Sequence, residues 1–253
     1  FDRTNYTQSD YRAIVGESLG LIYGYEFDGI YQVDDFYTSA ATGKLILKPG
    51  ITNNTRYDGG AAPGVVKYKD QNGDGKITTA DRTVIGNAMP KWFGGITNSF
   101  SFKGIDFSFM LQYSYGNDVF NATRQFATGS QDQRYNMLAE VADRWSPTNA
   151  SNKVPSTKGY VKGDVYSRFV EDGSFLRLKN MTLGYSLPKK WINKIHISKL
   201  RIYGTAQNLF CISGYSGYDP EVSTAASNPM TPGLDWGAYP KSRVFTFGLD
   251  VQF

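Results

Sequence analysis

A strict alternation of apolar and polar residues ends this chain and constrains its fold more than any other feature. From Val244 to Phe253, every second residue beginning with Phe245 is apolar, and most residues between them are small or polar. Successive side chains of a β-strand point to opposite faces, so this segment predicts a long strand with one apolar and one polar face. A strand that closes a barrel in an outer membrane has this pattern.

The same alternation runs from Ile105 to Tyr115. A strand of about 11 residues that is tilted by about 45° rises roughly 25 Å, the height of the apolar band of an outer-membrane barrel. Strands of soluble proteins average about 5–6 residues. The length therefore favours a membrane strand over a long strand of a soluble β-sandwich.

Composition narrows the class of protein further. The mean hydropathy is −0.40, and no apolar run approaches the roughly 18–20 residues of a transmembrane helix. This excludes a helical membrane protein but not a barrel, whose strands carry polar residues at every second position. The aromatic content of 15% suits strands and interfacial girdles, and a net charge of +4 is too balanced to predict a nucleic-acid partner.

The predicted fold is all-β: an antiparallel transmembrane β-barrel segment of about six strands with long extracellular loops. The strands are expected near residues 15–27, 94–102, 105–115, 175–187, 199–210 and 243–253. Long polar connections, at residues 28–93, 116–174 and 211–242, alternate with short ones at residues 103–104 and 188–198. Outer-membrane barrels have this rhythm of short periplasmic turns and long extracellular loops. A short helix is expected within residues 136–145.

One motif carries metal chemistry. Residues 70–81 match the calcium-loop template D-x-[DN]-x-[DN]-G-x5-[DE], with Gly75 at the sharp turn. The expected Ca²⁺ ligands are the side chains of Asp70, Asn72, Asp74 and Asp81 and the main-chain carbonyl of Lys76. The lead-in to Asp70 is strand-like, so we expect a single loop staple within a larger loop and not a paired EF-hand domain. A metal-free turn rich in Asn, Asp and Gly is the alternative.

Catalytic residues find little support in the sequence. The sole histidine, His196, lies in a short connection, and Cys211 has no histidine nearby. Carboxylate pairs such as Asp34 and Asp35 fall in loops, and no glycine-rich phosphate loop follows a strand. We therefore expect no enzyme.

With these features in place, the chain resembles the C-terminal part of the barrel in the SusC/RagA family of TonB-dependent outer-membrane transporters. The resemblance is carried by Gly20–Tyr31 (GLIYGYEFDGIY), Pro63–Ile77 (PGVVKYKDQNGDGKI) running into Asp81 and Arg82, Ile85–Gly95 (IGNAMPKWFGG), Asp172–Tyr185 (DGSFLRLKNMTLGY), Leu200–Phe210 (LRIYGTAQNLF) and the terminal Phe253. These stretches cover nearly the whole chain in order.

The resemblance implies a long protein with a periplasmic plug and a 22-stranded barrel. Members of the family import oligosaccharides or peptides across the outer membrane, using energy from the TonB complex and a SusD-like surface lipoprotein as a lid. No plug domain and no TonB box are found in this sequence. About six strands cannot enclose a lumen and would leave two unpaired edges in lipid. We expect the chain to be the last quarter of a barrel that other residues complete.

Two functional hypotheses follow. The first is a transport component in which loop aromatics contact the substrate or the lipoprotein, although these rings could equally pack the loop onto itself. The aromatics expected at such contacts are Tyr215, Tyr218, Trp236 and Tyr239. The second is a secreted, calcium-stabilised β-domain that binds glycans. It accounts for the calcium loop and the aromatics but not for the long two-faced strands.

Overall fold

Two compact units make up the chain. The computed structural model describes residues 5–8, 10–129, 135–192, 196–224, 228 and 230–253. The long-strand unit consists of Pro90–Asn117, Asp172–Glu221 and Ala238–Phe253, and the loop unit consists of Phe1–Met89, Asp118–Glu171 and Val222–Gly237. The long expected connections thus supply most of the loop unit. No helix in the described part of the chain is both long and apolar enough to span a membrane.

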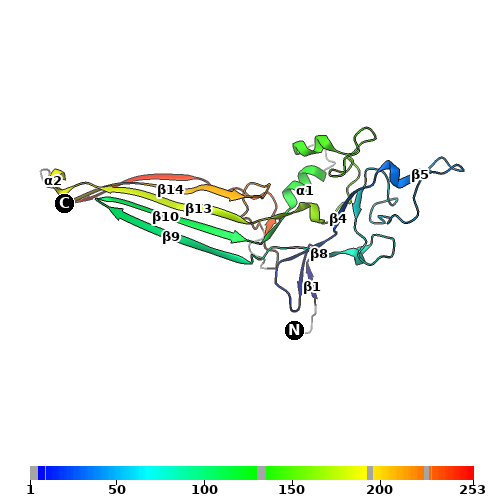
Figure 1. Ribbon diagram of the computed structural model, residues 1–253, viewed down its shortest axis with the longest axis horizontal. Coiled ribbons are helices and arrows are strands. Elements are labelled where there is room, and N and C mark those ends of the chain that lie inside the picture. Colours follow the sequence, from blue (N-terminus) through cyan, green and yellow to red (C-terminus); the bar gives the residue numbers. More distant parts are fainter. Residues whose placement is uncertain (1–4, 9, 130–134, 193–195, 225–227, 229) are drawn as a thin grey trace. The chain divides into compact units, whose positions relative to one another are not determined.

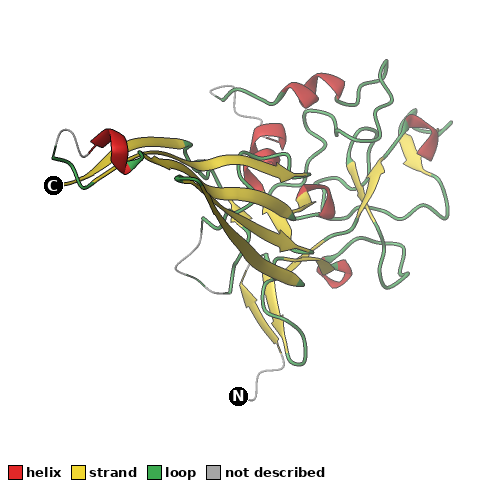
Figure 2. Ribbon diagram, turned by 60° about the vertical axis from the view of Figure 1, so that its left-hand side comes forward, coloured by secondary structure: helices red, strands yellow, loops and turns green. Residues whose placement is uncertain are grey.

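The long-strand unit is one antiparallel sheet of five strands (Figure 1). In sheet order, the strands are β16 (Val244–Gln252), β14 (Lys199–Ser213), β13 (Phe175–Ser186), β10 (Ile105–Tyr115) and β9 (Trp92–Phe102). Figure 2 shows that this sheet twists and curves along its length. The β9–β10 turn uses Lys103 and Gly104, both at positive φ (47° and 86°), as a two-residue hairpin turn of matching twist requires. The helix α2 (Lys189–Ile192) lies in the β13–β14 connection.

One face of this sheet is apolar across all five strands. The register places Phe107 opposite both Phe100 and Leu183, and it places Gly204 opposite both Leu183 and Phe247. The rings of Phe100 and Phe107 stack at 6.3 Å. Phe100 is nevertheless 58% exposed and Phe247 is 85% exposed. Large apolar side chains that pack beside each other and still face outward over a whole sheet suit a hydrocarbon environment better than water.

The alternation in β13 changes phase at Lys179. Met110 pairs with Asn180 and Leu111 pairs with Leu178, so Lys179 is an extra residue in the ladder. Because such a bulge shifts the side-chain phase by one residue, Leu178 faces the same side as Met181 despite the odd spacing. The weak alternation of residues 175–187 in the sequence therefore belongs to a strand whose apolar face is continuous.

The opposite face is polar and paired within itself. The Arg201 guanidinium donates two hydrogen bonds to the Asp106 carboxylate, at 2.9 and 2.5 Å, and one to Asp250 at 3.3 Å. The hydroxyls of Thr182 and Thr205 lie 3.1 Å apart. This face suits the water-filled side of a barrel wall.

Short strands and turns build the loop unit. One sheet has the strand order β1 (Asn5–Gln8), β2 (Tyr11–Ile14), β3 (Leu21–Gly24) and β8 (Thr83–Asn87). A second sheet has the strand order β12 (Val170–Asp172), β11 (Asp118–Asn121) and β15 (Leu234–Asp235). Two further strand pairs are β4 (Phe27–Ile30) with β7 (Val66–Tyr68), and β5 (Phe36–Thr38) with β6 (Leu45–Leu47). The helical segments are η1 (Val33–Asp35), η2 (Thr79–Asp81), α1 (Ala122–Gly129), η3 (Ala139–Asp143) and η4 (Ser167–Phe169).

An aromatic stack forms the core of the loop unit. The rings of Tyr25 and Tyr68 stack at 4.8 Å, and Tyr166 lies 5.4 Å from Tyr68 and 5.0 Å from Phe169. The Tyr25 N–H donates to the Val165 carbonyl at 2.8 Å. Residues far apart in the sequence are therefore tied together, and each buried ring contributes a large apolar area to the stability of the unit.

Two expected elements differ from the structure. Residues 15–27 do not form one barrel strand but contain β3 and the start of β4, because Gly16 and Gly20 have positive φ (91° and 78°) and turn the chain. Residues 136–145 contain only the short 3₁₀ segment η3, whereas the longer helix α1 lies earlier, in the stretch expected to be a loop.

We expect a charge on the apolar face to destabilise the barrel wall in the membrane. Phe109 lies in the middle of β10 on this face, and its neighbour Ser108 lies on the polar face. Phe109→Lys should lower the free energy of unfolding in lipid vesicles by about 2–4 kcal/mol and reduce the heat-modifiable band on gels of outer membranes, because the ammonium must enter hydrocarbon. Ser108→Lys is the matched control and should change both readouts little. Equal effects of the two variants would contradict the assignment of the faces.

Candidate ligand pocket and calcium loop

The loop unit contains a pocket of about 840 Å³ beside α1. This volume falls within the range of roughly 300–1,000 Å³ that is typical of small-molecule sites. Six aromatic residues belong to its lining, among them Phe126, Tyr135 and Trp236, which are exposed, and the charged or amide side chains are those of Asp10, Gln125 and Lys162. Apolar walls with a few polar groups are the usual composition of a ligand site.

The helix α1 supplies one wall of this pocket with one of its faces. Gln125, Phe126 and Gly129 line the pocket at helical spacings of one, three and four. Arg124 and Thr128, four residues apart, hold a different face of the helix, where Thr128 Oγ1 donates to the Arg124 carbonyl at 2.8 Å. The helix therefore has a pocket face and a polar supporting face.

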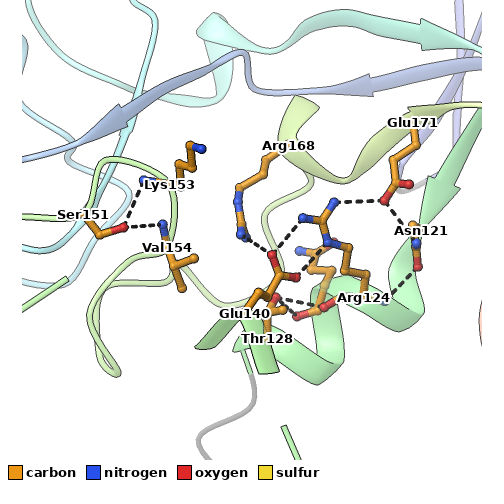
Figure 3. Close-up of polar contacts among 10 residues, drawn as sticks. Asn121, Arg124, Thr128, Glu140, Ser151, Lys153, Val154, Arg168 and Glu171 are labelled. Carbon is orange, nitrogen blue, oxygen red and sulfur yellow. Dashed lines mark hydrogen bonds and ion pairs between the residues drawn. The ribbon is translucent and has the colours of Figure 1, made fainter. Parts of the chain in front are cut away.

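A network of charges fixes the supporting face (Figure 3). Arg124 donates from Nε and Nη2 to the two carboxylate oxygens of Glu140, both at 2.8 Å, and from Nη1 to Glu171 at 3.0 Å. Arg168 donates to Glu140 at 3.0 Å, and Asn121 donates to Glu171 at 3.2 Å. The bonds from Arg124 lower the pKa of Glu140, and those to Glu140 raise the pKa of Arg124. Bidentate pairs of this kind orient the helix more rigidly than single contacts do.

The aromatic rings of the pocket contact each other edge to face. Phe126 lies 5.2 Å from Tyr135 at an interplanar angle of 70°, and 5.6 Å from Trp236 at 75°. The backbone on both sides of Trp236 is held, because its own N–H donates to Thr224 Oγ1 at 3.2 Å and the Gly237 N–H donates to Thr123 Oγ1 at 2.7 Å. Trp236 is still 57% exposed. A positioned yet exposed indole is available to a ligand.

The polar groups of the pocket differ in charge. Gln125 donates from Nε2 to the Asp164 carbonyl at 2.7 Å, which orients its amide. Burial raises the pKa of Asp10, and the charge of Arg82 opposes this shift. Lys162 is exposed and supplies a cation. The lining thus offers an acceptor, an amide and a donor within one site.

Tyr160 and Tyr166 also belong to the pocket lining, and their hydroxyls are buried. Both hydroxyls lie near the Arg168 guanidinium, and that of Tyr160 also lies near Thr128. Burial raises the pKa of both groups, so both are neutral at physiological pH. Buried hydroxyls of this kind usually have a partner.

The loop of residues 70–81 is shaped by its own side chains. The Asp70 carboxylate accepts from the N–H groups of Gly73 and Gly75, both at 2.7 Å, and Asp74 accepts from the Lys76 N–H at 2.8 Å. Desolvation acts to raise the pKa of Asp70, but the N–H donors outweigh it and lower the pKa. Asn72 accepts from the Asp74 N–H at 2.9 Å. The side-chain oxygens of Asp70, Asn72 and Asp74 thus hold the backbone of the loop in a tight turn.

The far end of this loop is anchored in the loop unit. Asp81 is fully buried and accepts from the N–H groups of Gln71, at 3.0 Å, and Thr78, at 2.8 Å. Ile77 is fully buried as well, and its N–H donates to the Asn53 carbonyl at 2.8 Å. Asp81 therefore links the first and last turns of the loop.

The five expected ligands supply oxygen atoms, which fit a hard cation such as Ca²⁺. Within the described residues, however, no three His, Cys, Asp or Glu side chains form a group that could hold a metal ion. The carboxylate oxygens of Asp70, Asp74 and Asp81 instead accept hydrogen bonds from backbone N–H groups. Calcium binding at this loop stays a prediction.

The expected contact aromatics fall in different surroundings. Trp236 lines the pocket and belongs to the loop unit. The other three belong to the long-strand unit, where Tyr215 is buried and Tyr218 and Tyr239 are 81% and 91% exposed. Sequence reasoning missed Phe126 and Tyr135, because both lie in a polar stretch without a periodic pattern.

Comparisons with known proteins identify the class. No family model matches the chain. It is 35% identical to TonB-dependent receptor P3 of Formosa agariphila over 94% of this chain and 22% of that protein, and 32% identical to TonB-dependent receptor SusC of Bacteroides thetaiotaomicron over 78% and 18%. The chain therefore spans about a fifth of the length of these relatives.

Solved structures agree in fold. The RagAB peptide transporter matches with a TM-score of 0.71 at 24% identity, over 100% of this chain and 25% of that chain. RagAB in an open-open state matches with a TM-score of 0.70 at 20% identity, over 100% and 24%. The five-stranded, two-faced sheet is thus a segment of a β-barrel fold. Its 35% identity to TonB-dependent receptor P3 over 94% of its length shows that the chain belongs to the SusC/RagA family of TonB-dependent outer-membrane transporters.

Proposed function

We propose that this chain contributes barrel wall and external loops to a transporter that imports oligosaccharides or peptides through the outer membrane. The observation that carries the proposal is the continuous apolar face of the sheet, on which Phe100 and Phe247 lie exposed. Such a face is stable against lipid and is a liability in water. The named relatives, TonB-dependent receptors, support the same activity.

The arrangement of connections supports the same function. The β9–β10 and β13–β14 connections are short, whereas the long segments from the other ends of the strands supply much of the loop unit. The short connections then lie on the periplasmic side and the long connections outside, where nutrients arrive. A secreted glycan-binding domain would have to cover the apolar face by other means.

A SusD-like surface lipoprotein is the proposed lid over the long connections of this chain. Tyr218 and Tyr239 project from loops of the long-strand unit and are among its most exposed aromatic side chains. Exposed tyrosines are favourable contact residues at protein interfaces, because each offers a large apolar area and a hydroxyl. The neighbour RagAB is described as a peptide importer, so a peptide substrate is open for this chain beside an oligosaccharide.

Ca²⁺ is proposed to rigidify the loop of residues 70–81. Asn72 and Asp74 are exposed and Asp70 is half-buried at the start of the loop, so a cation can reach their oxygens. Bound Ca²⁺ would draw these oxygens together and add to the anchoring by Asp81. The loop would then act as a structural staple within the external loops.

Import should depend on this protein and on TonB energy. In cells that lack the gene, or that lack TonB, uptake of a fluorescently labelled oligosaccharide or peptide that the parent cells import should fall to the level of passive leakage. In intact cells, unheated and heated gel samples of outer membranes should show one heat-shifting band much larger than 28.2 kDa. A soluble band near that mass, with unchanged uptake in the deletion strain, would refute the transport role.

Removal of two calcium ligands should abolish one metal site. The Asp70→Ala, Asp74→Ala double variant of the full-length protein should bind one Ca²⁺ fewer than the parent in titration calorimetry. It should also lose the drop in melting temperature that a chelator causes in the parent. Asp58→Ala, an exposed carboxylate outside the loop, is the control and should behave as the parent does. Identical heats for the parent and the double variant would remove calcium from the loop.

A further inference from the structure

We propose that the pocket beside α1 binds a hexose unit of a neutral oligosaccharide, with Trp236 as the stacking platform. The inference rests on the proposed import function, whose substrate class it names. The residues that carry it are the aromatic side chains Phe126, Tyr135 and Trp236 and the polar side chains Asp10, Gln125 and Lys162.

The aromatic part of the pocket suits the C–H face of a pyranose ring. Phe126 meets Tyr135 and Trp236 at steep interplanar angles of 70° and 75°, so the three rings form a concave apolar corner and not a closed stack. All three rings are exposed on the loop unit. A sugar ring presents apolar C–H groups to such a corner and keeps its hydroxyls at the edge, where polar side chains can reach them.

The polar part of the pocket suits hydroxyl groups. A sugar hydroxyl donates and accepts at once, so it needs neighbours of both kinds. Asp10 accepts, Lys162 donates, and Gln125 presents its carbonyl oxygen as an acceptor while its Nε2 is held by the Asp164 carbonyl. A site with one anion and one cation has no excess of either charge, which favours a neutral sugar over a sulfated or acidic one.

A peptide fits this pocket less well. Peptides are often captured by addition to an unpaired strand edge. The strand residues in the lining are Phe120 of β11 and Leu234 of β15, and these two pair with each other. The Leu234 carbonyl also accepts from the Thr224 N–H and hydroxyl, both at 2.8 Å. The carbonyl that an incoming peptide backbone would need at Leu234 is therefore already occupied.

The pocket is also built to keep its shape. The bidentate Arg124–Glu140 pair holds the supporting face of α1, so Gln125 and Phe126 are presented by a fixed helix. Trp236 is fixed through its backbone from the other side. Preorganised groups lose little conformational freedom on binding, and this favours recognition of a weakly bound ligand such as a sugar.

The test uses the full-length transporter purified in detergent. Binding is measured to arrays of neutral hexose oligomers of defined linkage, to sulfated and uronic-acid oligomers, and to a peptide digest of casein. At least one neutral oligomer should bind, and Trp236→Ala should weaken that binding about tenfold or more. Trp236→Phe should restore part of it, because a ring remains. Trp191→Ala, an exposed indole of the long-strand unit, should leave binding unchanged.

The outcomes separate this inference from the proposed function. Absence of binding to every neutral oligomer would overturn the inference, as would a neutral-oligomer affinity that is unchanged in Trp236→Ala. Peptide or acidic-sugar binding that is lost in Trp236→Ala would overturn it as well. A protein that fails these tests but still forms the heat-shifting band and supports uptake retains the transport function. Heat modification of each variant confirms that it folds.

Discussion

Hydrogen-bond register across the five long strands is the constraint on which the two-faced wall depends. A slip by one residue in any pair would turn a whole strand over and place its aromatics on the polar face. The ladders run from β9 to β16, with a register shift at Lys179 in β13 and, beside it, at Asn208 and Leu209 in β14. The bulge at Lys179 keeps the apolar face of β13 continuous, because the backbone gains one residue at the point where the apolar–polar alternation of the sequence shifts by one. On the polar face, Arg201 also holds the register, because it forms ion pairs with Asp106 and Asp250 on two different strands.

The loop unit is held together by different physics. Its strands are short, and its order comes from long-range contacts such as the stack of Tyr25 on Tyr68 and the hydrogen bond between Tyr25 and the chain at Val165. Ordering such long loops costs conformational entropy, which buried rings and charge-assisted hydrogen bonds offset. Rigid loops are the condition for a shaped pocket, whereas the sheet of long strands requires only a continuous apolar face.

How far the sequence predicts the structure depends on how local the signal is. The alternation from Ile105 to Tyr115 predicts β10 to the residue, because a period of two is visible within a single strand. The same rule fails at residues 15–27, where glycines at positive φ turn the chain, and blurs in β13, where the bulge hides the phase. The calcium motif is local as well, so its turn is visible in the sequence. The pocket is not, because Phe126 meets Trp236 only through the tertiary fold.

Arg124 links the network of charges on one face of α1 to the pocket on another face of the same helix. The guanidinium groups of Arg124 and Arg168 together balance the charges of Glu140 and Glu171, two carboxylates that would otherwise repel each other in a partly buried place. Partly buried charges lose hydration, and the loss is offset only when the geometry is rigid and every partner is present. The network of ion pairs therefore fixes the position of α1 more than it adds to the net stability of the protein. Because Gln125 and Phe126 follow Arg124 directly along the helix, the charges behind α1 set the geometry of the pocket in front of it.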